Sequence, residues 1–368
     1  MPFDRGSVSF RMLELPRAFP GDWVERFAEE RAGSLEAVGE GPQRGWVTGR
    51  HLLDSHITEE TAMLAGWVRL ALRQAERRVP AALLQAECRM EELAVQAAEG
   101  KPYLKAKQRS EIRRSVTERL LPAMPPQLKA VPFVYMPGAT HLYVSALAAA
   151  QLDVFNAALA ATLGFGGEPA TPEALGLKLK QPDLRDLPGT SFSPEMEGEA
   201  MEAAPGREFL TWLWFKAETQ NGRVALSEGR ELGVLLEGPL TFLHEGNGAH
   251  AAVLKKGAPE NSIEAKTCLL SGKKLKEAKV TFALDEENIW SFGFEADQFL
   301  IRGLKLPQGE GSLDSVSRFQ ERMIFLEQWR EIFLDLFGAF ADVRRDSRKW
   351  KTAVDEIREW VKGRPGRR

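Results

Sequence analysis

The chain has 368 residues, of which 43% are hydrophobic and 27% are charged, a composition typical of a globular protein with a sizeable core. No run approaches the ~18 to 20 consecutive apolar residues of a membrane-spanning helix, and the N-terminus, with Asp4 and Arg5, lacks the apolar core of a secretion signal. The chain has only two cysteines, Cys88 and Cys268, which excludes a disulfide framework and a zinc ribbon and predicts a location in the reducing cytoplasm. The net charge of -3 argues mildly against a nucleic-acid partner unless the positive charges are segregated along the chain.

The first half of the chain predicts an alternation of strands and helices. A strand is expected at 7–13, a helix capped by Asp22 at 22–31, and a half-buried antiparallel strand at 66–74, where apolar and polar residues alternate. Pro80 then opens a pair of helices between 81 and 121, divided at Gly100 and Pro102. The first of these carries an apolar row at helical spacing: Leu83, Leu84, Met90 and Leu93. A hairpin at 131–144 and a helix at 146–163 complete this half.

Residues 182–208 contain seven acidic residues and two arginines among Pro and Gly, which predicts an acidic linker or surface loop. An apolar helix at 209–217 and several strands follow, expected at 234–236, 241–243, 251–254, 279–284, 289–294 and 299–306. The pattern therefore predicts an α+β protein with mixed antiparallel sheets, a basic helical pair and a long C-terminal helix. Its expected regions are 1–181, 182–208, 209–343 and a basic helix and tail at 344–368.

The C-terminal helix has a broad apolar face that is unusually rich in aromatic residues. Its members are Phe319, Met323, Leu326, Trp329, Phe333, Leu336, Phe337 and Phe340. One side of a surface helix commonly needs fewer large apolar groups. We therefore expect this face to be buried against a symmetric partner in a homodimer.

Positive charge is concentrated in two segments. From Lys101 to Arg119 there are seven basic and two acidic residues, and from Ala251 to Phe282 seven lysines and three glutamates. The expected DNA-binding residues within them are Lys101, Lys105, Lys107, Arg109, Arg113, Arg114, Lys255, Lys256, Lys273, Lys274, Lys276 and Lys279. Aromatic residues are not interleaved with these charges, which argues against a platform for stacking single strands.

Three of these cations fall at positions i, i+4 and i+8 of the second basic helix. Lys105, Arg109 and Arg113 therefore form one stripe, next to the apolar row that includes Val116. A buried core would not accept such a stripe. The helix therefore either projects beyond the core or borders a wide polar channel.

No motif demands an enzyme. His51, Asp54 and His56 lack the spacing of a helical zinc pair, and neither a P-loop nor a hydrolase or protease signature occurs. The run Asp285, Glu286 and Glu287 could form the carboxylate cluster of a metal-dependent nuclease, but it lies between two apolar strands, where polar residues are needed for the turn.

Several short motifs occur in the order found in one family. They are Gly45-Trp46-Val47, Glu76-Arg77-Arg78-Val79-Pro80, Leu120-Leu121-Pro122, Ser271-Gly272-Lys273, Ala283-Leu284-Asp285, Trp290, Phe292, Arg302 and Leu304-Lys305. In this order, over residues 7 to 342, the chain resembles the recombination-associated RdgC family. The resemblance implies a ring-shaped homodimer with a positively charged hole that binds duplex DNA with little sequence preference. It also implies restraint of the RecA recombinase and no enzymatic activity.

The chain departs from that family at the gate where the ring would close. The family carries a Phe just after Leu-Leu-Pro, where this chain has Met124 and Pro125, and a Lys-Lys-Gln turn, where it has Lys255, Lys256 and Gly257. The lysines carry over and the Phe and Gln do not, so a closed gate would need different contacts.

The sequence thus predicts a non-enzymatic protein that binds double-stranded DNA without sequence preference, with no cofactor or metal. Its expected partners are duplex DNA, a second copy of itself and, functionally, RecA; its expected location is the cytoplasm, on the nucleoid. Two alternatives remain, the metal-dependent nuclease and a protein-interaction scaffold without affinity for DNA.

Overall fold

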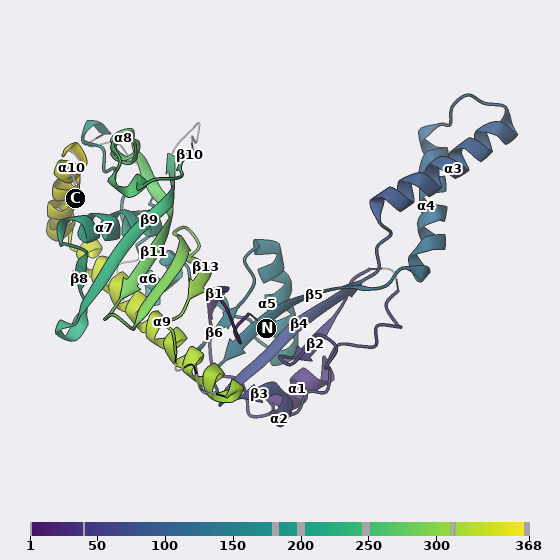
Figure 1. Cartoon of the computed structure of the whole chain (residues 1–368), viewed down its shortest axis with the longest axis horizontal. Coiled ribbons are helices and arrows are strands. Elements are labelled where there is room, and N and C mark those ends of the chain that lie inside the picture. Colours follow the sequence, from purple (N-terminus) through teal and green to yellow (C-terminus); the bar gives the residue numbers. More distant parts are fainter. Residues whose placement is uncertain are drawn as a thin grey trace. The chain divides into compact units, whose positions relative to one another are not determined.

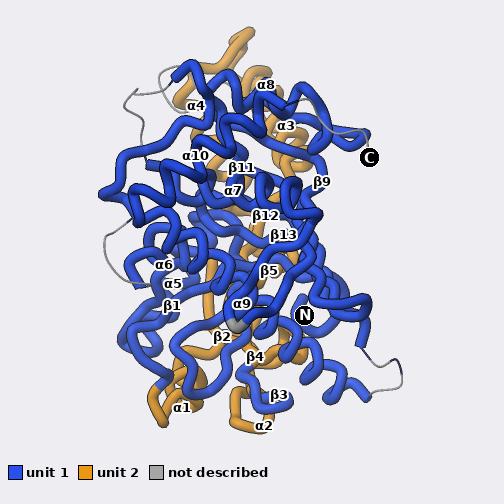
Figure 2. Tube along the Cα trace, turned by 90° about the vertical axis from the view of Figure 1, so that its left-hand side faces the viewer, with its two compact units in different colours: residues 1–19, 63–68, 133–368 blue, residues 20–62, 69–132 orange. Residues whose placement is uncertain are grey.

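The computed structural model describes residues 2–39, 41–178, 184–196, 203–244, 251–309, 311 and 314–363. The chain divides into two compact units (Figure 2). Unit 1 comprises residues 1–19, 63–68 and 133–368, and unit 2 comprises residues 20–62 and 69–132. This division differs from the predicted regions because unit 1 joins the first strand of the chain to strands near residue 300.

Unit 1 is built on antiparallel strands (Figure 1). Their order is β10-β9-β11-β12-β13-β1-β6-β5, with β7 on β1 and β8 on β9. Their bounds are β1 Val8–Glu14, β5 Gln127–Tyr135 (from Phe133 in this unit), β6 His141–Val144, β7 Glu168–Pro169, β8 Arg223–Ala225, β9 Glu231–His244, β10 Ala251–Leu254, β11 Lys273–Ala283, β12 Ile289–Glu295 and β13 Leu300–Lys305. A short strand β3, Met63–Leu64, pairs with the start of β4, Trp67–Glu76. The two strands predicted at 234–236 and 241–243 are a single long strand, β9.

The helices of unit 1 are α5 Ala149–Leu163, α6 Pro172–Lys178, α7 Pro205–Thr219, α8 Ile263–Leu270, α9 Ser315–Arg345 and α10 Ser347–Lys362, with 3-10 turns at Pro194–Met196, Ser227–Gly229 and Pro259–Asn261. The long α9 begins at a capping aspartate: Asp314 Oδ1 accepts the backbone N–H of Val316 at 2.7 Å and that of Ser317 at 3.1 Å. Asp346 caps α10 in the same way. No helix in the described part of the chain is both long enough and apolar enough to span a bilayer.

The aromatic face of α9 is buried inside unit 1. Phe209 on α7 lies 5.3 Å from Phe337, and Phe299 lies 5.0 Å from Phe333, measured between ring centroids. These rings meet edge to face, the arrangement that aromatic quadrupoles favour. The expectation that this face contacts a symmetric partner is therefore wrong. Apolar spacing predicts that a face is buried, but it does not identify which surface covers it.

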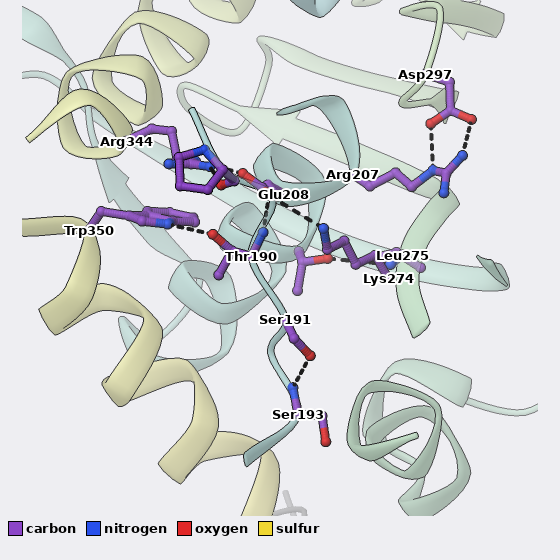
Figure 3. Close-up of polar contacts among 12 residues, drawn as sticks. Thr190, Ser191, Ser193, Arg207, Glu208, Lys274, Leu275, Asp297, Arg344 and Trp350 are labelled. Carbon is purple, nitrogen blue, oxygen red and sulfur yellow. Dashed lines mark hydrogen bonds and ion pairs between the residues drawn. The ribbon is translucent and has the colours of Figure 1, made fainter. Parts of the chain in front are cut away.

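The stretch predicted as an acidic linker is packed where the structure describes it. Leu184 and Phe192 are buried, and Glu208 lies inside α7 with 1% of its surface exposed. Its carboxylate accepts bonds from Lys274 Nζ and Arg344 Nε (Figure 3). The acidic composition was misleading, because the cations that neutralise Glu208 lie 66 and 136 residues away in the sequence.

Unit 2 contains the helices α1 Trp23–Glu29, α2 Glu59–Ala62, α3 Ala81–Glu99 and α4 Ala106–Leu120, a 3-10 turn at Leu121–Ala123, the strand β2 Gln43–Thr48, most of β4 and the start of β5. Strands β2 and β4 pair antiparallel, with Gln43 opposite Ala75 and Thr48 opposite Leu70. The rings of Phe27 and Trp46 pack against each other at 4.9 Å in its core.

Strand β4 is buried on both faces, so the prediction of a half-buried strand is wrong for Arg73. This side chain is 5% exposed and donates to the backbone carbonyls of Gly33 and Leu52. A guanidinium with five donors can satisfy buried carbonyls that an apolar residue would leave unpaired.

Helix α3 was predicted to carry an apolar row, but none of its residues is buried. Of that row, Leu83, Met90 and Leu93 are exposed.

Candidate nucleic-acid interface

Helices α3 and α4 form a hairpin within unit 2 (Figure 1). Gly100 ends α3 in the left-handed region, with φ at 61°, a conformation that glycine adopts without strain. Arg119 of α4 donates to Glu87 at 3.1 Å and Glu91 at 2.8 Å, both on α3. The predicted pair of helices is confirmed, but only α4 is basic, since α3 contains four glutamates and one arginine. Lys101 lies in the connecting loop and Lys105 caps α4 rather than lying within it.

The cations of α4 fall on two sides of the helix. Lys105, Arg109 and Arg113 are exposed and follow one another along one side, as their spacing predicts. Lys107 and Arg114 lie on about the opposite side. Of these two, Lys107 Nζ is 4.0 Å from Glu111 and Arg114 Nε is 2.8 Å from Glu118. Glu111 and Glu118 therefore offset charge on the side of α4 that carries Lys107 and Arg114, and the glutamates of α3 offset Arg119.

Arg109 and Arg113 line a groove of about 750 Å³ between the two helices. Its α3 wall includes Leu84, Cys88 and Arg89. Arg89 was not among the predicted DNA-binding residues because it stands alone in an acidic helix; it pairs with Glu92 at 3.5 Å. In the described part of the chain, no acidic side chain forms an ion pair with Arg109 or Arg113. Three arginines, Arg89, Arg109 and Arg113, and one acidic residue, Glu92, therefore line this groove.

The tip of the hairpin carries further positive charge. Lys101 Nζ lies 2.7 Å from Glu99, whose pKa is lowered by the hydrogen bond from Lys101 and a second one from Gln108. This lysine is therefore partly neutralised, although 58% of its side chain is exposed.

The second basic segment is mostly occupied by internal ion pairs, which corrects several predictions. Lys274 is 1% exposed and lies 3.4 Å from Glu208, so it is a core residue that DNA cannot reach. Lys279 pairs with Glu237 at 2.6 Å. Lys276 lies 3.2 Å from Asp297 and 3.5 Å from Glu295. Burial lowers the pKa of Lys276, but the hydrogen bond and charge of Asp297 outweigh it and leave this pKa raised.

Three of the predicted lysines in this segment form no ion pair with a described acidic residue. Lys255 and Lys256 are exposed at the bend after β10, and Lys273 is half-buried beside Ser271. Lys256 and Gly257 have φ values of 72° and 70°, which define a tight turn. Together with Lys255, they make up the predicted gate turn, which lies in unit 1.

The other predicted gate residues, Met124 and Pro125, lie in unit 2 after α4. Arg77 holds this segment by donating to the carbonyls of Pro122 and Met124 and, through Nε, to that of Val38 at 2.8 Å. Pro125 is exposed and Met124 half-buried.

The proposed nuclease carboxylates occupy a turn between β11 and β12. Asp285 Oδ1 accepts the N–H groups of Glu287 at 2.9 Å and Asn288 at 2.8 Å, and the bonds from Asn288 lower the pKa of Asp285. Near the predicted histidines, Asp54 accepts from Thr48 Oγ1 at 2.7 Å. Among the residues described, no three His, Cys, Asp or Glu side chains are placed to hold a metal ion together.

Residues 24–175 match the sequence model of the family described as "RdgC: Putative exonuclease, RdgC". Over these residues the chain is RdgC-like. The matched region includes the whole α3–α4 hairpin and ends before the second basic segment. No curated protein matches the sequence. The likeness of this region to the RdgC family indicates a DNA-associated role connected with recombination.

Proposed function

We propose that this protein binds double-stranded DNA without sequence preference and catalyses no reaction on it. The observation that carries the proposal is the exposed stripe of Lys105, Arg109 and Arg113 on α4, whose arginines form no ion pair with a described acidic residue. The cations on the opposite side of the same helix are paired with glutamates. Cations held in line on a rigid helix, next to a groove, suit the regularly spaced phosphates of a DNA backbone.

The binding energy would come mainly from counterion release. Each neutralised phosphate contributes roughly -0.9 to the slope of log affinity against log salt, so about six contacts give a slope near -5. Phosphate contacts carry no base information, which is why affinity should not depend on sequence.

The family likeness supports two further parts of the proposal. The first is that two copies encircle the duplex, with Lys255 and Lys256 and the segment at Met124 and Pro125 at the gate. The second is that the bound protein modulates homologous recombination by restraining RecA, because a protein occupying the duplex competes for the DNA on which recombination acts. In both parts the protein would be associated with the nucleoid.

A gel shift with random-sequence duplex DNA across a salt series tests the proposal. We expect binding with a steep salt dependence and equal affinity for unrelated sequences. A slope shallower than about -2, or a strong preference for one sequence, would contradict backbone binding. No binding at any salt concentration would instead favour a protein-interaction scaffold.

The description of the matched family as an exonuclease favours one second candidate, a metal-dependent nuclease using Asp285, Glu286 and Glu287. Incubating linear and plasmid DNA with the protein and Mg²⁺ tests it. Magnesium-dependent degradation that is lost in Asp285→Asn with Glu287→Gln would support the nuclease. Intact DNA after prolonged incubation would support the non-enzymatic proposal.

A further inference from the structure

Tyr103 is the one exposed aromatic residue in the described part of the chain, with 72% of its surface accessible. The other aromatic side chains there are buried or half-buried, although the chain contains 20 Phe, 9 Trp and 3 Tyr. Tyr103 lies at the tip of the helical hairpin, in the loop between α3 and α4. An aromatic ring at such a position gains nothing from the core of the protein and is available to contact a ligand.

The loop that carries Tyr103 is held at both ends. The N–H of Lys101 donates to Gln96 O at 3.1 Å, and the N–H of Lys105 donates to Gln108 Oε1 at 3.2 Å. Leu104, the next residue, is 2% exposed and anchors the loop by its side chain. The tyrosine ring is therefore presented from a fixed backbone. Only its own two side-chain torsions need to be ordered on binding, a small entropic cost for a large contact area.

Positive charge flanks this ring. Lys101 and Lys105 lie two residues before and after it, and Lys107 follows with 88% of its side chain exposed. Glu99 partly offsets the charge of Lys101, and Glu111 lies 4.0 Å from Lys107. The interpretation that no aromatic residue is interleaved with the basic charges is therefore wrong at Tyr103. A stackable ring between cations matches the two parts of a nucleotide, because the ring can stack on a base while lysines contact the adjacent phosphates.

We propose that Tyr103 stacks on an unpaired base, so that the hairpin tip recognises duplex DNA containing a gap or a bulge. This inference rests on the proposed DNA binding and adds a preferred substrate to it. A base inside an intact duplex is already stacked on both sides and is costly to expose, whereas an unpaired base is available at little cost. The lysines at the tip favour a polyanion over an apolar protein surface as the ligand.

The test compares two duplexes that differ only in an internal two-nucleotide bulge containing the fluorescent base 2-aminopurine. We expect the protein to bind the bulged duplex about tenfold more tightly than the intact one, the size expected for one stacked base. Binding should also change the fluorescence of the unpaired 2-aminopurine, because stacking quenches it. Tyr103→Ala should lose both effects and keep its affinity for the intact duplex, whereas Tyr103→Phe should retain both.

Leu93→Ala is the matched control, since Leu93 is another exposed apolar residue of the hairpin, with 49% of its surface accessible. It should leave both affinities unchanged, and circular dichroism should show that each variant is folded. Equal affinity of the unaltered protein for the two duplexes would overturn the inference while leaving the proposed function intact. An equal loss of affinity for both duplexes in Tyr103→Ala would also overturn it, since the ring would then contact the backbone or another part of the protein. Failure to bind either duplex would overturn both proposals.

Discussion

Arg344 of α9 donates through Nε to Glu208 of α7 at 2.6 Å, and the two side chains are 4% and 1% exposed. The carboxylate also accepts from the N–H of Thr190 at 3.0 Å and from Lys274 (Figure 3). The guanidinium of Arg344 lies 4.8 Å from the ring of Trp350. This one cluster of buried charges joins α7, β11, α9 and α10 of unit 1.

We expect Glu208→Ala to lower the free energy of unfolding by about 3 to 5 kcal/mol, because it leaves Lys274 and Arg344 buried without a counter-charge. Urea unfolding followed by circular dichroism measures the change. Glu231→Ala is the control, since it removes a glutamate from the exposed pair with Arg223 and should cost less than about 1 kcal/mol. Equal stability of the two variants would show that the buried cluster contributes little.

The lysines of the second basic segment should fall into two groups, one that stabilises the fold and one that binds DNA. Lys274→Ala should destabilise the fold by about 3 kcal/mol or more, because Glu208 would lose one of its buried partners. Lys255→Ala with Lys256→Ala should leave stability unchanged and weaken duplex DNA binding, since both side chains are exposed. Thermal unfolding and fluorescence anisotropy on the same preparations distinguish these outcomes. A folded Lys274→Ala protein with weakened DNA binding would be inconsistent with this assignment.

The α4 stripe can be tested with two variants that remove equal charge from one helix. Arg109→Ala with Arg113→Ala should weaken duplex binding and reduce the salt slope by up to about two units, one per lost phosphate contact. Lys107→Ala with Arg114→Ala should have a smaller effect, because these cations are already paired with Glu111 and Glu118. Both variants should fold, since exposed alanines favour a helix. If the two variants weakened binding equally, total charge rather than the stripe would determine affinity.

Stability should depend on pH through Asp297. Burial raises the pKa of this carboxyl, but hydrogen bonds and charge from Arg207 and Lys276 outweigh burial, so its pKa lies below the ordinary value. The ionised group therefore stabilises the folded state fully at neutral pH, and this contribution is lost as the pH falls through the lowered pKa. Asp297→Asn should be less stable by about 2 kcal/mol at pH 7.

Urea unfolding of this variant and the unaltered protein at several pH values provides the measurement. The difference in unfolding free energy should shrink between about pH 5 and pH 2, where the carboxyl becomes protonated. A difference that stays constant over this range would mean that the charge of Asp297 makes no contribution.

A homodimer is still expected, but its contact must use a surface other than the aromatic face of α9. Light scattering at micromolar concentration should give about twice the mass of one chain, 41.0 kDa. Phe337→Ala should lower the free energy of unfolding by about 3 to 5 kcal/mol, because it leaves a cavity in unit 1, and should not change the mass of the folded protein. A monomer mass for the unaltered protein would rule out the dimer.

The local elements of this protein follow from its amino-acid sequence. Pro80, Gly100 and Pro122 delimit the helical hairpin, and the spacing of Lys105, Arg109 and Arg113 predicts their common side of α4. Each of these features depends on residues within a few turns of one another, where backbone restrictions and helical periodicity act directly. The α+β class and the apolar faces of α7 and α9 follow from the same local patterns.

Contacts between distant parts of the chain determine which charged side chains are buried in ion pairs and which elements cover each apolar face. Lys274 and Lys255 are both lysines of one basic segment, but Lys274 faces Glu208 in the core while Lys255 lies on an exposed bend. The difference depends on Glu208 and Arg344, which are separated by 136 residues and brought together by packing. Hydrophobic spacing likewise predicted that α9 is buried, but the covering surface came from distant elements of its own unit. Local periodicity identifies a face, whereas its partner is set by contacts between residues far apart in the chain.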